Sequence, residues 1–159
     1  MIDHVQALSL RDAERWFDGS HESRAAVESL CGGRVAWVGA LDGEMLSASP
    51  VRLHAGPKLL LAFVDVDPSG SGPAAAGPHG MRPAQAARVV ALVRSLHAAP
   101  EPWALMVHCY AGVSRSAAIA EWAQRAHSRM PAERFLALHP HVAPNPHVLR
   151  LLRAADPGA

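Results

Sequence analysis

The stretch WALMVHCYAGVSRSAAIAEWAQRAHSRM, residues 103–130, decides how this chain folds. Its first part, residues 103–109, is an apolar run with the length of a buried strand. Its last part, residues 114–130, has the alanine-rich, amphipathic pattern of a helix. The intervening YAGVS must turn the chain sharply, and Gly112 permits the backbone angles that such a turn needs. The stretch therefore predicts a strand, a tight loop and a helix in succession.

The same alternation of strand and helix extends over the rest of the chain. Further strands are predicted at residues 2–8, 34–41 and 58–64. Further helices are predicted at residues 20–31, with Ser20 as the cap, at residues 82–99, and in two short segments opened by Pro131 and by Asn145–Pro146. The expected fold is α/β, with a central, largely parallel sheet of about four to five strands flanked by helices.

Length, composition and charge place the chain among ordinary globular proteins. Its 159 residues suggest a single domain, 1–159, and half of them are hydrophobic. The net charge of +1 gives no overall field that would attract nucleic acid or a membrane surface, so neither is expected as a partner. Because the N-terminus lacks a signal-peptide layout and no apolar run approaches a membrane span, we expect a cytoplasmic protein.

A long segment rich in glycine and proline separates two of the predicted elements. DVDPSGSGPAAAGPHGMRP, residues 65–83, exceeds the length of an ordinary connection. It leaves the sheet at the end of a predicted strand, where α/β proteins bind ligands. We therefore expect a mobile loop at residues 65–83 that borders a functional site.

The tight loop has the features of an anion site. Its amides and the positive end of the following helix can converge on one ligand, and the planar guanidinium of Arg115 can bond two oxygens of one phosphate. Such donors stabilise a thiolate over a thiol, which makes Cys109 a candidate nucleophile. The predicted phosphate-binding residues are Tyr110, Ala111, Gly112, Val113, Ser114 and Arg115.

Two neighbours of the nucleophile have supporting roles in this hypothesis. The hydroxyl of Ser116 is placed to hydrogen-bond the sulfur and ease its departure as a leaving group, and His108 is placed to brace the loop. Tyr110, the only tyrosine, either faces solvent or lines the pocket. Cys31, the second cysteine, is expected in the core, because two distant cysteines do not make a disulfide framework.

These residues carry a resemblance to a known family. HCYAGVSRS, residues 108–116, resembles the H-C-x5-R-[S/T] signature of the cysteine-dependent protein tyrosine phosphatase superfamily, which includes the dual-specificity enzymes. The chain is also similar to a group of small bacterial proteins identified as predicted tyrosine phosphatases. That group shares an aspartate turn after a strand, an HCxAGxSRS loop and a late PN segment, here Pro144–Asn145.

The resemblance implies hydrolysis of a phosphate monoester through a phosphocysteine intermediate, with an aspartate on a mobile loop as the general acid. Asp65 and Asp67 are the two candidates. Asp65 is preferred because it follows the strand directly, but it lies further before Cys109 than is common in compact dual-specificity enzymes. Asp67 precedes Pro68 and remains the alternative general acid. For Asn145 a helix cap is the favoured role.

The remaining predictions concern ligands and rival functions. No cofactor and no metal are expected, since His139, His141 and His147 match no recognised zinc spacing. The expected partner is a phosphoprotein or a small phosphomonoester substrate, and the oligomeric state is open. Two alternatives stand beside the enzyme: a phosphate- or phosphoprotein-binding module with weak catalysis, and a rhodanese-like sulfurtransferase.

Overall fold

The structure is a computed structural model of the chain and describes residues 1–66 and 79–158. In these residues four parallel strands form one sheet in the order β1-β4-β2-β3. The strands are β1 (Ile2–Leu8), β2 (Val35–Leu41), β3 (Lys58–Ala62) and β4 (Trp103–His108). The predicted α/β fold with a parallel sheet is therefore confirmed, and all four predicted strands are present.

Burial explains why the two inner strands read as continuous apolar runs. Every residue of β2 is buried, and β4 is buried from Ala104 to His108. Strands covered on both faces lose the alternation of apolar and polar residues, which survives only on strands with an open face or edge. The edge strand β3 accordingly alternates between buried and more exposed positions. Since β4 lies between β1 and β2, the loop after it emerges in the middle of the carboxyl edge of the sheet.

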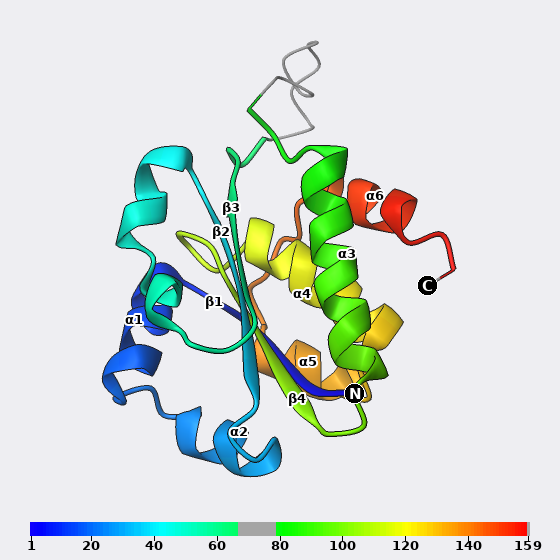
Figure 1. Ribbon diagram of the computed structural model, residues 1–159. Helices are drawn as coiled ribbons and strands as arrows, with labels where there is room; N and C mark the ends of the chain where they lie inside the picture. Colours follow the sequence, from blue (N-terminus) through cyan, green and yellow to red (C-terminus); the bar gives the residue numbers. More distant parts are fainter. Residues whose placement is uncertain (67–78, 159) are drawn as a thin grey trace.

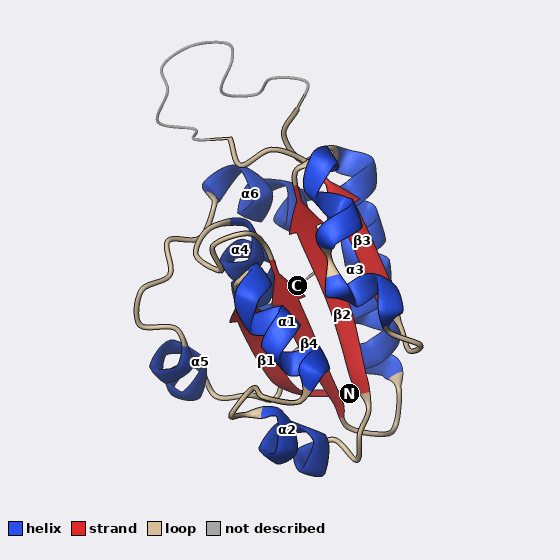
Figure 2. Ribbon diagram, turned by 90° about the vertical axis from the view of Figure 1, so that its left-hand side faces the viewer, coloured by secondary structure: helices blue, strands red, loops and turns tan. Residues whose placement is uncertain are grey.

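Helices cover both faces of the sheet, as Figures 1 and 2 show. One face carries α1 and α2 together with two short 3-10 helices, and the other carries α3, α4, α5 and α6. The α-helices are α1 (Leu10–Asp18), α2 (Arg24–Leu30), α3 (Pro83–Ala98), α4 (Arg115–His127), α5 (Ala132–Leu138) and α6 (Pro146–Ala155). The 3-10 helices are η1 (Gly43–Ala48) and η2 (Pro50–Leu53). None of the described helices has the length and apolar character needed to cross a membrane.

Each face of the sheet has its own hydrophobic core. The larger core joins the sheet to α3, α4 and α6, and Ile119 and Leu152 are fully buried in it. The smaller core lies under α1 and α2, where the rings of Trp16 and Trp37 meet edge to face at 5.8 Å. Cys31 is fully buried in this smaller core, and burial raises the pKa of its thiol. Both cysteines are free thiols.

The structure differs from the sequence-based prediction at two helices. The helix predicted over residues 20–31 with a Ser20 cap begins only at Arg24, so that cap is wrong. The backbone N–H of Ser20 instead donates to Asp18 Oδ1 at 2.8 Å, in the turn that ends α1. Helix α1 itself was not predicted, although Ser9 caps it by accepting from the N–H of Asp12. Residues 67–78 of the predicted mobile loop lie outside the described residues.

Candidate active site

The loop after β4 packs tightly against the end of β1. It runs over residues 109–114, between the last residue of β4 and the first of α4. Gly112 has a φ of +78°, and a Cβ there would lie 2.6 Å from the backbone nitrogen of Ser9 and 2.8 Å from the carbonyl carbon of Leu8. Only glycine combines that backbone angle with such a close approach. The close contact between the loop and the end of β1 therefore requires glycine at position 112.

The carbonyl groups of the loop are held from outside by other segments. Backbone N–H groups donate to them as follows: Leu10 to Tyr110, Ala143 to Val113, and Asn145 to Ser114. The loop amides are not used in the same way. Within the described residues, the N–H groups of Ala111, Val113 and Arg115 have no acceptor. A loop with its carbonyls turned outward and its amides unpaired, at the start of a helix, is suited to hold an anion.

Cys109 lies at the base of this loop with two donors beside its sulfur. The N–H of Gly112 donates to Cys109 Sγ at 3.2 Å, and the hydroxyl of Ser116 lies 3.1 Å from the same atom. Cys109 is only 2% exposed. Both groups can donate a hydrogen bond to the sulfur. Ser116 reaches this position because it lies in the first turn of α4.

Arg115 is buried and anchored through one of its three nitrogens. Its Nη1 donates to Asp42 Oδ1 and to the carbonyl of Phe63, each at 2.7 Å. Its Nε is buried and has no partner in the described part of the chain. A guanidinium held by Nη1 has its Nε and Nη2 edge left for two oxygens of one ligand. Sequence reasoning did not single out Asp42, although it directly follows the buried strand β2; Asp65, by contrast, lies three residues beyond the end of β3.

Asp65 lies at the rim of the loop and is held there by two side chains. Its Oδ1 accepts from the hydroxyl of Ser114 at 2.8 Å and from Nδ2 of Asn145 at 2.7 Å. The Asn145 amide also donates to the carbonyl of Val66, while its Oδ1 accepts from the N–H of Val148. Asn145 therefore caps α6, as expected, and also joins α6 to the segment that carries Asp65. The alternative acid, Asp67, lies outside the described residues.

His108, the last residue of β4, is held inside the protein by a contact outside the loop. It is fully buried, and its Nε2 lies 2.8 Å from the hydroxyl of Ser49, which follows η1. A Cβ at Gly39 would lie 2.8 Å from the same nitrogen, so glycine makes room for the ring. Burial lowers the pKa of His108 to about 4. The ring is therefore neutral near pH 7 and adds no charge beside Cys109.

The exposed rim of the loop is apolar. Tyr110 is 63% exposed and Val113 is 38% exposed. Of the two alternatives for Tyr110, the structure favours the solvent-facing one. Val64, which precedes Asp65, is exposed as well.

Two of the three histidines considered as metal ligands, His139 and His147, have hydrogen-bond partners within the protein. Nε2 of His139 accepts from the N–H of Ala7 at 2.8 Å, and its Nδ1 lies 2.8 Å from the carbonyl of Phe135. His147 lies 3.1 Å from the carbonyl of Met81. Within the described residues, no group of three histidine, cysteine, aspartate or glutamate side chains is placed to hold a metal ion.

Comparison with known proteins identifies the fold. No protein-family model and no curated protein matches this sequence. The structure is similar to a crystal structure of a point variant of human DUSP28, a dual-specificity phosphatase, with a TM-score of 0.54. The match covers 98% of this chain and 94% of that chain at 20% sequence identity. The chain therefore has the fold of a dual-specificity phosphatase.

Proposed function

We propose that this protein is a cysteine-dependent phosphatase of the tyrosine or dual-specificity type, which hydrolyses phosphate monoesters through a phosphocysteine intermediate. One observation carries the proposal. Cys109 Sγ lies within hydrogen-bond distance of Gly112 N–H and Ser116 Oγ, in a loop where the N–H groups of Ala111 and Val113 have no acceptor among the described residues. A nucleophile inside a set of anion donors is the arrangement that in-line attack on a phosphate requires.

The first step transfers the phosphoryl group to the enzyme. The amides of Ala111, Val113 and Arg115 and the free edge of the Arg115 guanidinium bind the non-bridging oxygens of the phosphate. The thiolate of Cys109 attacks phosphorus, the S–P bond forms, and the bond from phosphorus to the leaving oxygen breaks. Asp65, protonated at the start of this step, gives its proton to that oxygen. Oδ2 of Asp65 suits this role because the hydrogen bonds from Ser114 and Asn145 both go to Oδ1.

The second step returns the enzyme to its starting state. Asp65, now a carboxylate, accepts a proton from a water molecule that attacks phosphorus. The P–S bond breaks and its electron pair returns to sulfur as a thiolate. The hydroxyl of Ser116 and the N–H of Gly112 stabilise that thiolate as it leaves. Inorganic phosphate is the second product.

The charges around the loop support a substrate with a single phosphate. No lysine lies in the loop or next to it. Lys58, the only lysine of the chain, stands at the start of β3, at the opposite edge of the sheet from Cys109. A polyphosphorylated headgroup would need more cations than Arg115 provides. The exposed Tyr110 and Val113 suit an aryl leaving group, such as a phosphotyrosine side chain in a protein, and a free catalytic thiol suits a reducing compartment such as the cytoplasm.

The test compares Cys109→Ser with the matched variant Cys31→Ser on p-nitrophenyl phosphate. We expect the Cys109 variant to fall to the background rate and to retain its folded circular dichroism spectrum, while the Cys31 variant stays active. Acid-quenched wild-type protein should carry one phosphoryl group on the peptide that contains Cys109. Full activity of Cys109→Ser would refute the proposal.

Two other outcomes would support the rival functions instead. Tight binding of a phosphopeptide by the wild-type protein, without any hydrolysis, would support a binding module. A persulfide on Cys109 after treatment with thiosulfate, again without phosphate release, would support a sulfurtransferase.

A further inference from the structure

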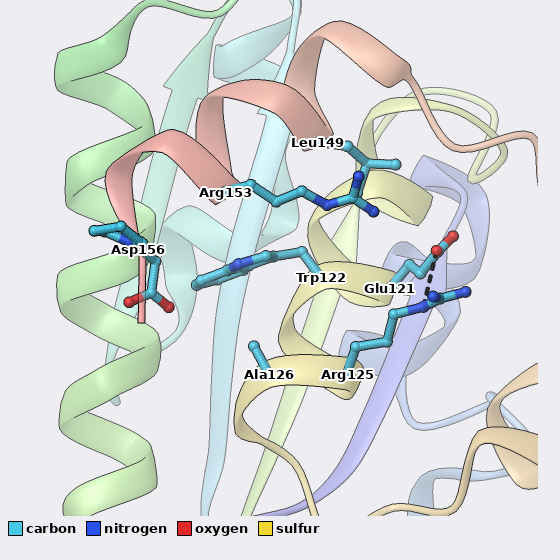
Figure 3. Close-up of a pocket in the computed structure, with 8 residues that line it drawn as sticks. Glu121, Trp122, Arg125, Ala126, Leu149, Arg153 and Asp156 are labelled. Atoms are coloured by element: carbon cyan, nitrogen blue, oxygen red, sulfur yellow. Dashed lines mark ion pairs between the residues drawn. The ribbon is translucent and has the colours of Figure 1, made fainter. Parts of the chain in front are cut away.

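A cavity of about 520 Å³ lies between α4 and α6, outside the loop that holds Cys109. Figure 3 shows its lining, with Trp122 and Ala126 on α4 and Leu149 and Arg153 on α6. The volume falls within the range of small-molecule sites in proteins. The proposed phosphatase chemistry uses none of the side chains that line it.

The floor of this cavity is aromatic and carries an unpaired donor. Trp122 is 4% exposed, and its indole Nε1 is buried without a hydrogen-bond partner in the described residues. That nitrogen is on the edge of the ring that faces Arg153 in Figure 3. Buried N–H groups are rarely left without an acceptor, because the loss of hydration is not compensated. A ligand oxygen that enters between Arg153 and the ring would satisfy this N–H.

The charges of the lining leave one cation uncompensated. Asp156 is buried, with one oxygen bonded by Arg94 and the other 2.6 Å from Nε2 of His127. Arg125 is paired with Glu121 at 3.1 Å. Within the described residues, the exposed side chain of Arg153 forms no ion pair and no hydrogen bond. The cavity therefore presents one free guanidinium beside the Trp122 ring.

We propose that this cavity binds a small planar aromatic molecule with one carboxylate group. The carboxylate pairs with Arg153 and accepts from Trp122 Nε1, while the aromatic ring lies against the indole and Leu149. Arg153 favours an anion over a neutral molecule, and because the carboxylates of Glu121 and Asp156 are already paired, the one uncompensated cation matches a single carboxylate group. The proposal does not depend on the function assigned to Cys109, because it rests on residues outside the loop.

The two helices that line the cavity both begin next to the Cys109 loop. Helix α4 begins at Arg115, and helix α6 begins directly after Asn145, which holds Asp65. The same two helices that form the walls of the cavity therefore start at the proposed active site.

The experiment is a titration of the ¹⁵N-labelled full chain with 2-naphthoate, followed by NMR. The indole N–H signal of Trp122 is identified as the one missing from Trp122→Phe. We expect a saturable shift of that signal. The neutral analogue 2-naphthamide and the Arg153→Met variant should each show affinity at least about tenfold weaker, whereas the Arg88→Met variant, altered at an exposed arginine of α3 outside the cavity, should bind like wild type.

The opposite results would overturn the proposal. They are the absence of a saturable shift at Trp122, an unchanged affinity in Arg153→Met, or a shift confined to the Gly112 amide, which would place the ligand in the Cys109 loop. Because the readout is binding at Trp122, loss of the proposed phosphatase activity would leave this test unaffected. Conversely, absence of binding here would not bear on that activity.

Discussion

Asp42 holds the guanidinium of Arg115 by a single nitrogen, with Oδ1 of Asp42 accepting from Nη1 at 2.7 Å. The carboxylate is half exposed, whereas the arginine side chain is buried. Solvent screening of such a pair limits its contribution to the free energy of folding. Its effect is orientation, because it fixes the edge of the guanidinium that a phosphate would meet.

Removal of this anchor should weaken phosphate binding. In Asp42→Ala, Arg115 keeps only the Phe63 carbonyl as a partner, so we expect kcat/KM on p-nitrophenyl phosphate to fall about tenfold. Inhibition by vanadate should weaken by a similar factor. Asp42→Asn retains an acceptor oxygen and should recover part of the loss. Wild-type kinetics in Asp42→Ala would show that Arg115 is positioned by the loop alone.

A general acid at Asp65 predicts a dependence on the leaving group. Asp65→Asn should reduce kcat on phenyl phosphate by about 10²- to 10³-fold, because phenolate is a poor leaving group without a proton. The loss on p-nitrophenyl phosphate should be much smaller, since nitrophenolate departs unaided. Asp67→Asn is the matched comparison. If Asp67→Asn shows the steeper dependence, the acid role belongs to Asp67.

Asn145 has two functions that substitution can separate. Asn145→Ala removes the cap of α6 and the bond to Asp65, so it should lose about 1 kcal/mol of stability and also lower kcat. Asn145→Ser retains a capping oxygen but is too short to replace the amide that reaches Asp65. We therefore expect serine to restore the urea midpoint and not the rate. Recovery of both by serine would mean that the contact with Asp65 has no effect on catalysis.

The sequence predicted the strands and the loop well because each is encoded by adjacent residues. The two inner strands are apolar runs covered on both faces, and Cys109, Arg115 and Ser116 lie within eight positions of one another. Asp42 could not be assigned in the same way. It approaches Arg115 because β2 lies beside β4 in the sheet, and that order is not visible in a single sequence.

The missed and misplaced helices have a related explanation. Helix α1 is short and largely polar, with only Leu10, Ala13 and Trp16 buried, so its apolar periodicity is weak. The sequence feature that could have indicated the start of α1 is the cap, Ser9 followed three residues later by Asp12. The start of α2 was misplaced because Ser20 has the side chain of a cap but takes part in the preceding turn.

The buried neutral His108 should make the protein less stable in mild acid. Burial lowers its pKa from 6.5 to about 4 in the folded state, while the unfolded chain keeps the ordinary value. Between pH 6.5 and 4 the unfolded state therefore binds a proton that the folded state does not, which favours unfolding as the pH falls. For one such group the free energy of unfolding drops by up to about 1.4 kcal/mol per pH unit.

Urea unfolding at pH 7 and at pH 5 checks this expectation. Burial also lowers the pKa of His4, His21, His54 and His139, so wild type should lose stability through all five side chains. His108→Gln keeps a donor for Ser49 and removes one titrating group, so the difference between the two pH values should shrink. His141→Gln, at an exposed position, should retain the wild-type difference. An equal loss of stability on acidification in wild type and His108→Gln would mean that His108 is charged in the folded protein.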